Sequence, residues 1–179
     1  MKAVSDGRRE GQDEMVCRYA ERVFTMIVRQ VGDVMDAQEL TQDTFLRAFS
    51  RINSYDASRA SLSTWLCRIA YRLTLDFQKR RRPPIVAIEN NEEALAEISD
   101  EQLEAELSTK SEERICQLEQ LIDDLSDDER MLVTLYYYDD LPLAEISYIM
   151  GIETKPLAKR LYRIRRKLYK KLKEDVREI

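Results

Sequence analysis

The chain has 179 residues, of which 44% are hydrophobic and 35% are charged, with a formal net charge of -5. It contains no histidine, which excludes a histidine general base and a histidine-containing zinc site. The three cysteines form no CxxC pair and indicate reduced thiols in a cytoplasmic protein. Only four glycines and four prolines are present, which favours helices in one or two small domains.

Charge is unevenly distributed along the chain. Residues 1–82 carry a net charge of +4, residues 83–130 carry -13 and residues 131–179 carry +4. An acidic block of this size is typical of a solvated linker or an interaction segment. Pro83 and Pro84 end any preceding helix, so a domain boundary is predicted after Arg82. The predicted parts are a tail at 1–14, a first domain at 15–82, an acidic linker at 83–111 and a second domain at 112–179. Residues 92–107 of the linker could form a marginal helix.

No apolar run approaches the roughly 20 residues of a membrane span. We also expect no signal peptide, because the first residues of the chain are polar.

The first domain begins with two stretches of helical periodicity. A helix over residues 15–31 would bury the stripe Val16, Tyr19, Val23 and Ile27. The next stretch, residues 33–52, places at helical spacing Leu40, Phe45, Ala48, Phe49 and Ile52. Carboxylates near its start suit the helix dipole, and they are either a solvated first turn or a surface for a partner. These polar residues are Asp36, Glu39, Gln42 and Asp43.

The third predicted helix, around "STWLCRIAYRLTLDFQKRRR" (63–82), contains the only tryptophan. Its predicted buried face consists of Leu62, Leu66, Ile69, Ala70, Leu73 and Phe77. The opposite face carries Thr64, Arg68, Tyr71, Arg72, Leu75 and Lys79. Cations beside an aromatic ring suit phosphate contact and base stacking, although an ordinary amphipathic helix with long arginines gives the same pattern. Trp65 lies at the edge, and periodicity leaves open whether it belongs to the core or stacks on a base.

The second domain shows the start and end signals of three helices. Ser126 and Glu129 form a capping box, and Asp139, Asp140 and Pro142 end the helix that follows. A short helix then carries Leu143, Ile146, Ile149 and Met150.

Gly151 supplies the positive φ angle of a tight turn before the last helix. Thr154 can cap that helix, and Pro156 is tolerated in its first turn. Its apolar stripe is Leu157, Leu161, Ile164, Leu168 and Leu172, and its opposite face is Lys155, Lys159, Tyr162, Arg163, Arg166 and Lys170. This pattern is typical of a DNA-binding helix-turn-helix, and the alternative is a plain helical hairpin with a basic surface.

Together the two domains resemble a bacterial RNA polymerase sigma factor of the sigma-70 family, in its extracytoplasmic-function (ECF) group. The resemblance rests on "DAQELTQDTFLRAFSRI", the Trp-containing helix, and "LSDDERMLVTLYYYDDLPLAEISYIMGIETKPLAKRLYRIRRKL", in this order. It implies an all-α fold of two small domains, a region 2 helical bundle and a region 4 helix-turn-helix, joined by the acidic linker. The implied function is to bind core RNA polymerase, direct it to promoters and promote DNA melting, with no enzymatic activity and no cofactor.

The resemblance also assigns expected roles to individual residues of this chain. Polymerase contact, through the coiled coil of the largest subunit, is expected at Asp36, Glu39, Leu40, Gln42, Asp43 and Phe45. Contact with the -10 element and the melted strand is expected at Ser54, Tyr55, Arg59, Thr64, Trp65, Arg68, Tyr71, Arg72 and Lys79. Contact with the -35 element is expected at Thr154, Lys155, Lys159, Arg160 and Arg163. The sequence departs from the family pattern at Pro142, Pro156, Leu157 and Ala158.

The resemblance further implies contact with the flap of the second-largest polymerase subunit and an anti-sigma partner, and we expect a monomer. Three other classes stay open on the residues alone. A stand-alone helix-turn-helix regulator would bind duplex DNA without polymerase, and a helical adaptor would bind only proteins. An enzyme is disfavoured by the missing histidines and the missing phosphate-binding loop.

Overall fold

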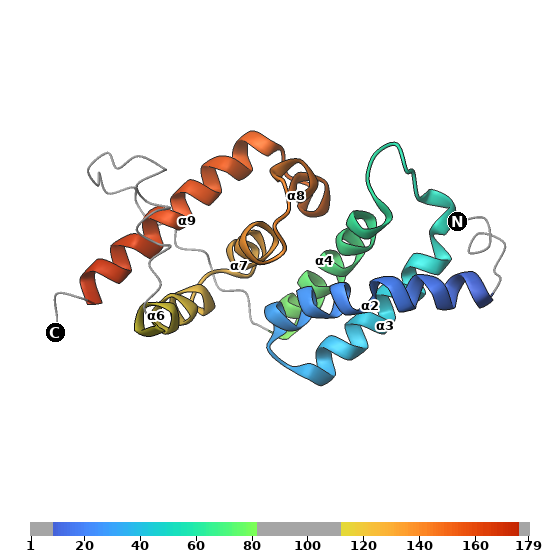
Figure 1. Ribbon diagram of the computed structural model, residues 1–179, viewed down its shortest axis with the longest axis horizontal. Helices are drawn as coiled ribbons and strands as arrows, with labels where there is room; N and C mark the ends of the chain where they lie inside the picture. The colour runs from blue at the N-terminus through green and yellow to red at the C-terminus, as the bar shows by residue number, and fades with distance from the viewer. Residues whose placement is uncertain (1–8, 82–111, 176–179) are drawn as a thin grey trace.

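The computed structural model describes residues 9–81 and 112–175, and every regular element in these two ranges is helical (Figure 1). The all-α expectation is therefore confirmed. The elements of the first domain are α2 (Arg9–Val31), α3 (Val34–Ser50), the short 3₁₀ turn η1 (Ile52–Ser54) and α4 (Leu62–Arg81). Those of the second domain are α6 (Glu112–Asp123), α7 (Asp127–Val133), the π-helical turn η2 (Thr134–Tyr138), α8 (Leu143–Met150) and α9 (Thr154–Asp175). The predicted acidic linker and its marginal helix lie outside the described residues.

The three helices α2, α3 and α4 pack on one another around the core of the first domain. Its fully buried side chains include Met26 and Ile27 on α2 and Leu66 on α4, and Phe45 on α3 is buried beside them. Helix α2 begins at Arg9, six residues before the predicted start, and its buried stripe includes Met15. The prediction for Val16 was wrong, because this side chain is 37% exposed and lies beside the stripe.

A two-residue turn, Gly32 and Asp33, ends α2 and starts α3. Gly32 adopts a left-handed conformation with φ of 75°, which ends α2 without a Cβ clash. The Asp33 carboxylate then accepts a 2.9 Å hydrogen bond from the backbone N–H of Asp36 and caps α3. Helix α3 therefore begins at Val34 with its acidic residues close to its positive end.

The second domain forms from the predicted capping and turn signals. Ser126 and Glu129 make both hydrogen bonds of a capping box at the start of α7. The chain continues into one π-helical turn, closed by the bond from the Asp139 N–H to the Thr134 carbonyl, and it turns at Asp140 with φ of 50°. Gly151, with φ of 72°, joins α8 to α9 as predicted.

Helix α9 lies across α6, α7 and α8 and closes the core of the second domain. Its residues Leu157, Leu161, Ile164 and Leu168 are buried, as the periodicity predicted. Thr154 is the first helical residue and Pro156 lies in the first turn, where a missing N–H costs no hydrogen bond.

The two domains are in direct contact. Helix α4 packs against α8, and α2 packs against α7 and η2. Figure 1 shows α7 and α8 between α9 and the first domain. Helix α4 is therefore covered on two sides, by its own domain and by the second one. In residues 9–81 and 112–175 no helix is long and apolar enough to cross a membrane.

Candidate nucleic-acid and polymerase interfaces

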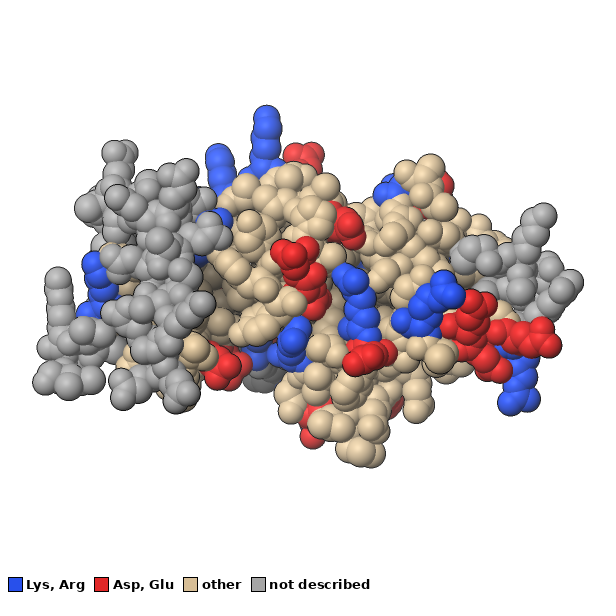
Figure 2. All heavy atoms as spheres, viewed as in Figure 1, with Lys and Arg blue, Asp and Glu red and all other residues tan. Residues whose placement is uncertain are grey.

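The N-terminal part of α9 presents cations to solvent. Buried Leu157 and Leu161 fix the rotation of the helix, so the side chains of Thr154, Lys155, Lys159 and Arg163 lie on its exposed face. Figure 2 shows Lys and Arg side chains projecting from this end of α9, next to α8. A short helix, a glycine turn and a cationic second helix match the geometry that enters a major groove, and the cations suit phosphate oxygens.

Arg160 differs from its neighbours on α9. It is half-buried, and its guanidinium is close enough to Tyr71 of the first domain to oppose the rise in the pKa of that phenol. Its Nη1 atom is buried without a protein hydrogen-bond partner. Arg160 therefore faces the contact between the domains in this conformation, and not the exposed side of α9.

The predicted outward face of α4 is largely covered by the second domain. Thr64 and Tyr71 are 3% and 4% exposed. The Thr64 hydroxyl donates to Glu145 Oε2 of α8 at 2.5 Å, and the Tyr71 phenol donates to Asp128 Oδ1 of α7 at 2.9 Å.

Arg68, on the same face of α4, is half-buried. Its guanidinium carbon lies 4.6 Å from the centre of the Tyr148 ring of α8. Burial is the main cause that raises the pKa of Tyr71, and Asp128 adds to it. This phenol is therefore held as a hydrogen-bond donor.

Trp65 belongs to the core in this structure. It is 7% exposed, and its ring lies 5.5 Å from the ring of Tyr55, centre to centre. The Tyr55 hydroxyl in turn donates to the Ala60 carbonyl at 3.2 Å. The pair ties the loop between α3 and α4 to the start of α4.

The loop of residues 51–61 forms around a polar turn. The Asp56 carboxylate accepts hydrogen bonds from the backbone N–H and the hydroxyl of Ser58, and these bonds lower the pKa of Asp56. Ser54 and Arg59 are exposed on this loop, whereas Tyr55 is half-buried. On α4 itself, Arg72 and Lys79 are exposed. Four of the nine predicted -10 residues thus lie at the surface.

Helix α3 divides its predicted polymerase residues between core and surface. Leu40 and Phe45 are buried and contribute to packing, which corrects the expectation that they contact a partner. Asp36 is half-buried and paired with Arg81 of α4. Glu39, Gln42 and Asp43 are exposed.

Two residues on the same face of α3 were missed by the sequence reasoning. Met35 and Leu46 are 72% and 65% exposed. They lie four residues before Glu39 and four residues after Gln42, so all these side chains share one side of the helix. We call Met35, Glu39, Gln42, Asp43 and Leu46 the α3 surface. The signal was available, because both apolar residues are out of phase with the buried stripe.

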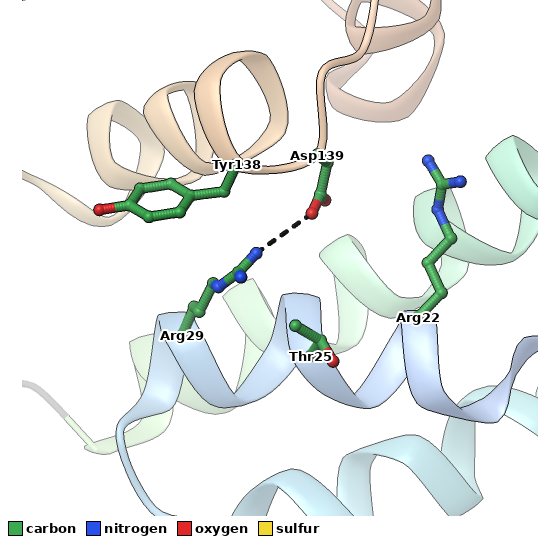
Figure 3. Close-up of a pocket in the computed structure, with 5 residues that line it drawn as sticks. All are labelled: Arg22, Thr25, Arg29, Tyr138 and Asp139. Carbon is green, nitrogen blue, oxygen red and sulfur yellow. Dashed lines mark hydrogen bonds and ion pairs between the residues drawn. The ribbon is translucent and has the colours of Figure 1, made fainter. Parts of the chain in front are cut away.

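A pocket of about 270 Å³ lies between α2 and η2, at the edge of the domain contact. Figure 3 shows Arg29 directed at Asp139, with 3.3 Å between Nη1 and Oδ1, and Arg22 and Thr25 along the same helix. The Arg29 guanidinium also lies 4.8 Å from the centre of the Tyr138 ring. Burial raises the pKa of Asp139, although Arg22 and Arg29 oppose the rise.

The fold is that of a two-domain helical protein, and α8 and α9 of the second domain form a helix-turn-helix. Two family descriptions match the chain: Sigma-70 region 2 over residues 15–83, and Sigma-70, region 4 over residues 117–168. It is 30% identical to the ECF RNA polymerase sigma factor SigW of Bacillus subtilis (strain 168), over 97% of this chain and 95% of that protein. Identity is also 30% with the ECF RNA polymerase sigma-E factor of Escherichia coli (strain K12), over 99% and 94%.

Solved structures share the fold. CnrH, in complex with the cytosolic domain of CnrY, aligns with a TM-score of 0.65 and 19% identity over 97% of this chain and 95% of that one. The sigma factor RpoE of Bartonella quintana, in complex with the anti-sigma factor NepR, aligns with a TM-score of 0.62 and 18% identity over 90% and 96%. The chain therefore belongs to the sigma-70 family and is an ECF sigma factor, a protein without enzymatic activity that directs RNA polymerase to promoters.

Proposed function

We propose that this sigma factor reads the -35 element through the exposed N-terminal face of α9. The observation that carries the proposal is the set of exposed side chains Thr154, Lys155, Lys159 and Arg163 on one side of the second helix of a helix-turn-helix. Lysine and arginine fix the position of the protein on the phosphates, and contacts with base edges then provide sequence selectivity.

The -10 element is contacted by the loop of residues 51–61 and by α4. Ser54 and Arg59 are exposed on the loop, and Arg72 and Lys79 are exposed on the helix. Opening a duplex costs about 1.4 kcal/mol per stacked step, whereas stacking a base on an aromatic ring returns roughly 1–3 kcal/mol. A protein that holds unpaired bases therefore favours opening, and contacts with polymerase supply the remainder.

Core polymerase binds the α3 surface. This surface combines two exposed apolar side chains, Met35 and Leu46, with the carboxylates of Glu39 and Asp43. Apolar area surrounded by charge is typical of a protein interface. We assign it to the coiled coil of the largest polymerase subunit, and we assign the flap of the second-largest subunit to the second domain.

An anti-sigma factor is a further partner in the cytoplasm, where sigma factors act. The RpoE structure with NepR supports this assignment, because that sigma factor shares the fold of this chain and is bound by an anti-sigma factor.

Run-off transcription with core polymerase, with and without this protein, tests the proposed function. Transcripts that begin at defined promoters only when the protein is present support it. Binding of duplex promoter DNA with no such transcripts would instead indicate a stand-alone helix-turn-helix regulator. Lys159→Ala tests the α9 assignment, since it should weaken promoter use without reducing the affinity for core polymerase.

A further inference from the structure

Glu153 lies in the turn of the helix-turn-helix, directly before α9, and its side chain is exposed. It is the only acidic residue of positions 152–173, a stretch otherwise rich in lysine and arginine. Thr154 and Lys155 follow it, and both belong to the exposed set that we assign to the -35 element. A carboxylate at this place needs a physical reason, because it repels the phosphates that the neighbouring cations attract.

Helix capping does not supply that reason. The backbone carbonyl of Glu153 accepts a 3.1 Å hydrogen bond from the Leu157 N–H, so Glu153 occupies the N-cap position of α9. Serine, threonine, aspartate and asparagine are preferred there, because their short side chains reach back to the free N–H groups of the first turn. Glutamate is one methylene longer than aspartate and is not among them, so the stability of α9 does not account for this residue.

An ion pair within α9 does not supply the reason either. Side chains three and four residues apart meet on a helix, and these two positions hold Pro156 and Leu157. Within residues 9–81 and 112–175, the Glu153 carboxylate makes no hydrogen bond and no ion pair. Its oxygens are therefore available to a group outside this part of the chain.

The start of α9 is the part of a helix-turn-helix that reaches the bases. In this class of fold the first residues of the second helix contact base edges in the major groove, and the surrounding cations contact phosphates. Gly151, with φ of 72°, sets the direction in which the chain leaves α8, and buried Leu157 fixes the rotation of α9. The junction of α8 and α9 lies at the edge of the molecule (Figure 1). Glu153 thus projects from the end of α9 that would enter the groove.

The chemistry of a carboxylate selects one base in the major groove. Guanine presents the acceptors N7 and O6, and thymine presents the acceptor O4, and all of these repel a carboxylate. Adenine presents its N6 donor beside the N7 acceptor, so attraction and repulsion offset each other. The only polar group of cytosine on this edge is the N4 amino group, which donates a hydrogen bond to a carboxylate oxygen. Repulsion by the phosphates disfavours every complex in which the carboxylate lacks that donor.

We propose that Glu153 is a specificity-determining residue that accepts a hydrogen bond from the N4 amino group of a cytosine in the -35 element. This inference rests on the proposed function, because it requires the start of α9 to lie in the major groove of that element. Lys155 and Lys159 contribute affinity for any sequence through the phosphates. Glu153 adds selectivity, because its contact is favourable with one base and unfavourable with the others.

The experiment selects promoter DNA with the holoenzyme formed from core RNA polymerase and the full chain. The probe is a pool of duplex DNA randomised across the -35 and -10 regions, and the bound sequences are read by sequencing. Wild-type holoenzyme should prefer cytosine on one strand at one -35 position. Glu153→Ala should reduce that preference about tenfold and leave the other positions unchanged. Unchanged preferences at every position would overturn the proposal, even with tighter overall binding, because the loss of a negative charge alone strengthens binding to all sequences.

Glu153→Gln provides a second readout that a structural role would not move. A glutamine amide both donates and accepts, so it pairs with N6 and N7 of adenine. The ratio of adenine to cytosine at the same position should therefore rise above its wild-type value. An unchanged ratio would contradict a direct contact between this side chain and the base.

Glu153→Asp separates the reach of the side chain from its charge and from folding. Aspartate keeps the charge and is a better N-cap residue, so thermal unfolding should show a second domain at least as stable as the wild type. Its carboxylate turns back to the N–H groups of α9, and the cytosine preference should fall as it does in Glu153→Ala. A cytosine preference of wild-type strength in this variant would overturn the proposed contact, because charge alone would then account for the selectivity.

Two control variants complete the set. Lys155→Ala removes a phosphate contact and should weaken binding to all sequences without changing the base preferences. Glu21→Ala removes an exposed carboxylate from α2 and should change neither binding nor preferences. Wild-type holoenzyme with no preference at any -35 position would overturn the proposed function. Clear -35 preferences that are identical in the wild type and in all Glu153 variants would overturn this inference alone.

Discussion

The phenol of Tyr71 on α4 donates a 2.9 Å hydrogen bond to the carboxylate of Asp128 on α7, from one domain to the other. Tyr71 is 4% exposed, and burial raises the pKa of its phenol, so it remains a donor at neutral pH. One bond therefore joins a residue expected at the promoter to a residue 57 positions further along the chain, and no local sequence pattern links the two.

Tyr71→Phe should weaken the contact between the domains and leave each domain folded. The ring is kept and only the hydroxyl is lost, so the expected cost is about 1.5 kcal/mol, the low end for hydrogen bonds to charged groups, because Asp128 is half-buried. Urea unfolding monitored by circular dichroism measures it. Tyr169→Phe, on the distal part of α9, is the control and should change stability little. Equal midpoints for Tyr71→Phe and the wild type would contradict the role of this bond.

Trp65 should behave as a core residue. Since it is the only tryptophan and is 7% exposed, the fluorescence of the free chain should be blue-shifted and poorly quenched by acrylamide. Trp65→Ala should reduce the free energy of unfolding by roughly 3–5 kcal/mol, because the cavity would lie against Tyr55. A red-shifted, readily quenched spectrum would instead place the indole at the surface.

The capping box of α7 should stabilise the second domain in a pH-dependent way. Burial raises the pKa of Glu129, but hydrogen bonds with the Ser126 backbone and hydroxyl, together with Lys167, outweigh it and lower the pKa overall. A carboxyl with a lowered folded-state pKa stabilises the fold above its ordinary pKa, and this contribution is lost as pH falls through the folded-state value.

Glu129→Gln should therefore lower the melting temperature at pH 7 and have a much smaller effect in acid below the folded-state pKa. Ser126→Ala removes the other half of the box and should cost about 1 kcal/mol at neutral pH. Thermal unfolding at several pH values measures both effects. A Glu129→Gln penalty of the same size in acid and at pH 7 would show that the carboxylate charge is not its source.

Much of the fold could be predicted because its signals are local. The capping box at Ser126, the left-handed Gly151 and the buried stripe from Leu157 to Leu168 each depend on residues a few positions apart. The cationic face of α9 follows from that stripe, since burial of one side of a helix exposes the other.

The faces of α4 could not be predicted in the same way. Periodicity separated Leu66 and Leu73 from Thr64 and Tyr71, and both groups are buried. The second group is covered by residues more than 50 positions away in the sequence, and the pattern of a single helix contains no information about such a partner. For α3, Leu40 and Phe45 were assigned to a partner surface by resemblance although their own spacing places them in the core.

Exposed cations on α4 should act after polymerase has bound. Arg72→Ala and Lys79→Ala should each lower open-complex formation, measured by permanganate reactivity of unpaired thymines, with little change in affinity for core polymerase. Both side chains are exposed, so the substitutions should not affect folding. An equal loss of polymerase affinity would remove the assignment to promoter DNA.

The α3 surface should determine the affinity for core polymerase. Leu46→Lys places a charge on a side chain that is 65% exposed, so folding should persist, while an apolar contact with a partner would be lost. Asp43→Lys reverses a charge on the same surface and should abolish co-purification with core polymerase.

Val16→Lys is the control, since Val16 is an exposed apolar residue on α2 outside this surface. Surface plasmon resonance with immobilised core polymerase should show strong losses for the two α3 variants and none for the control. Comparable binding by all three would place the polymerase contact elsewhere on the first domain.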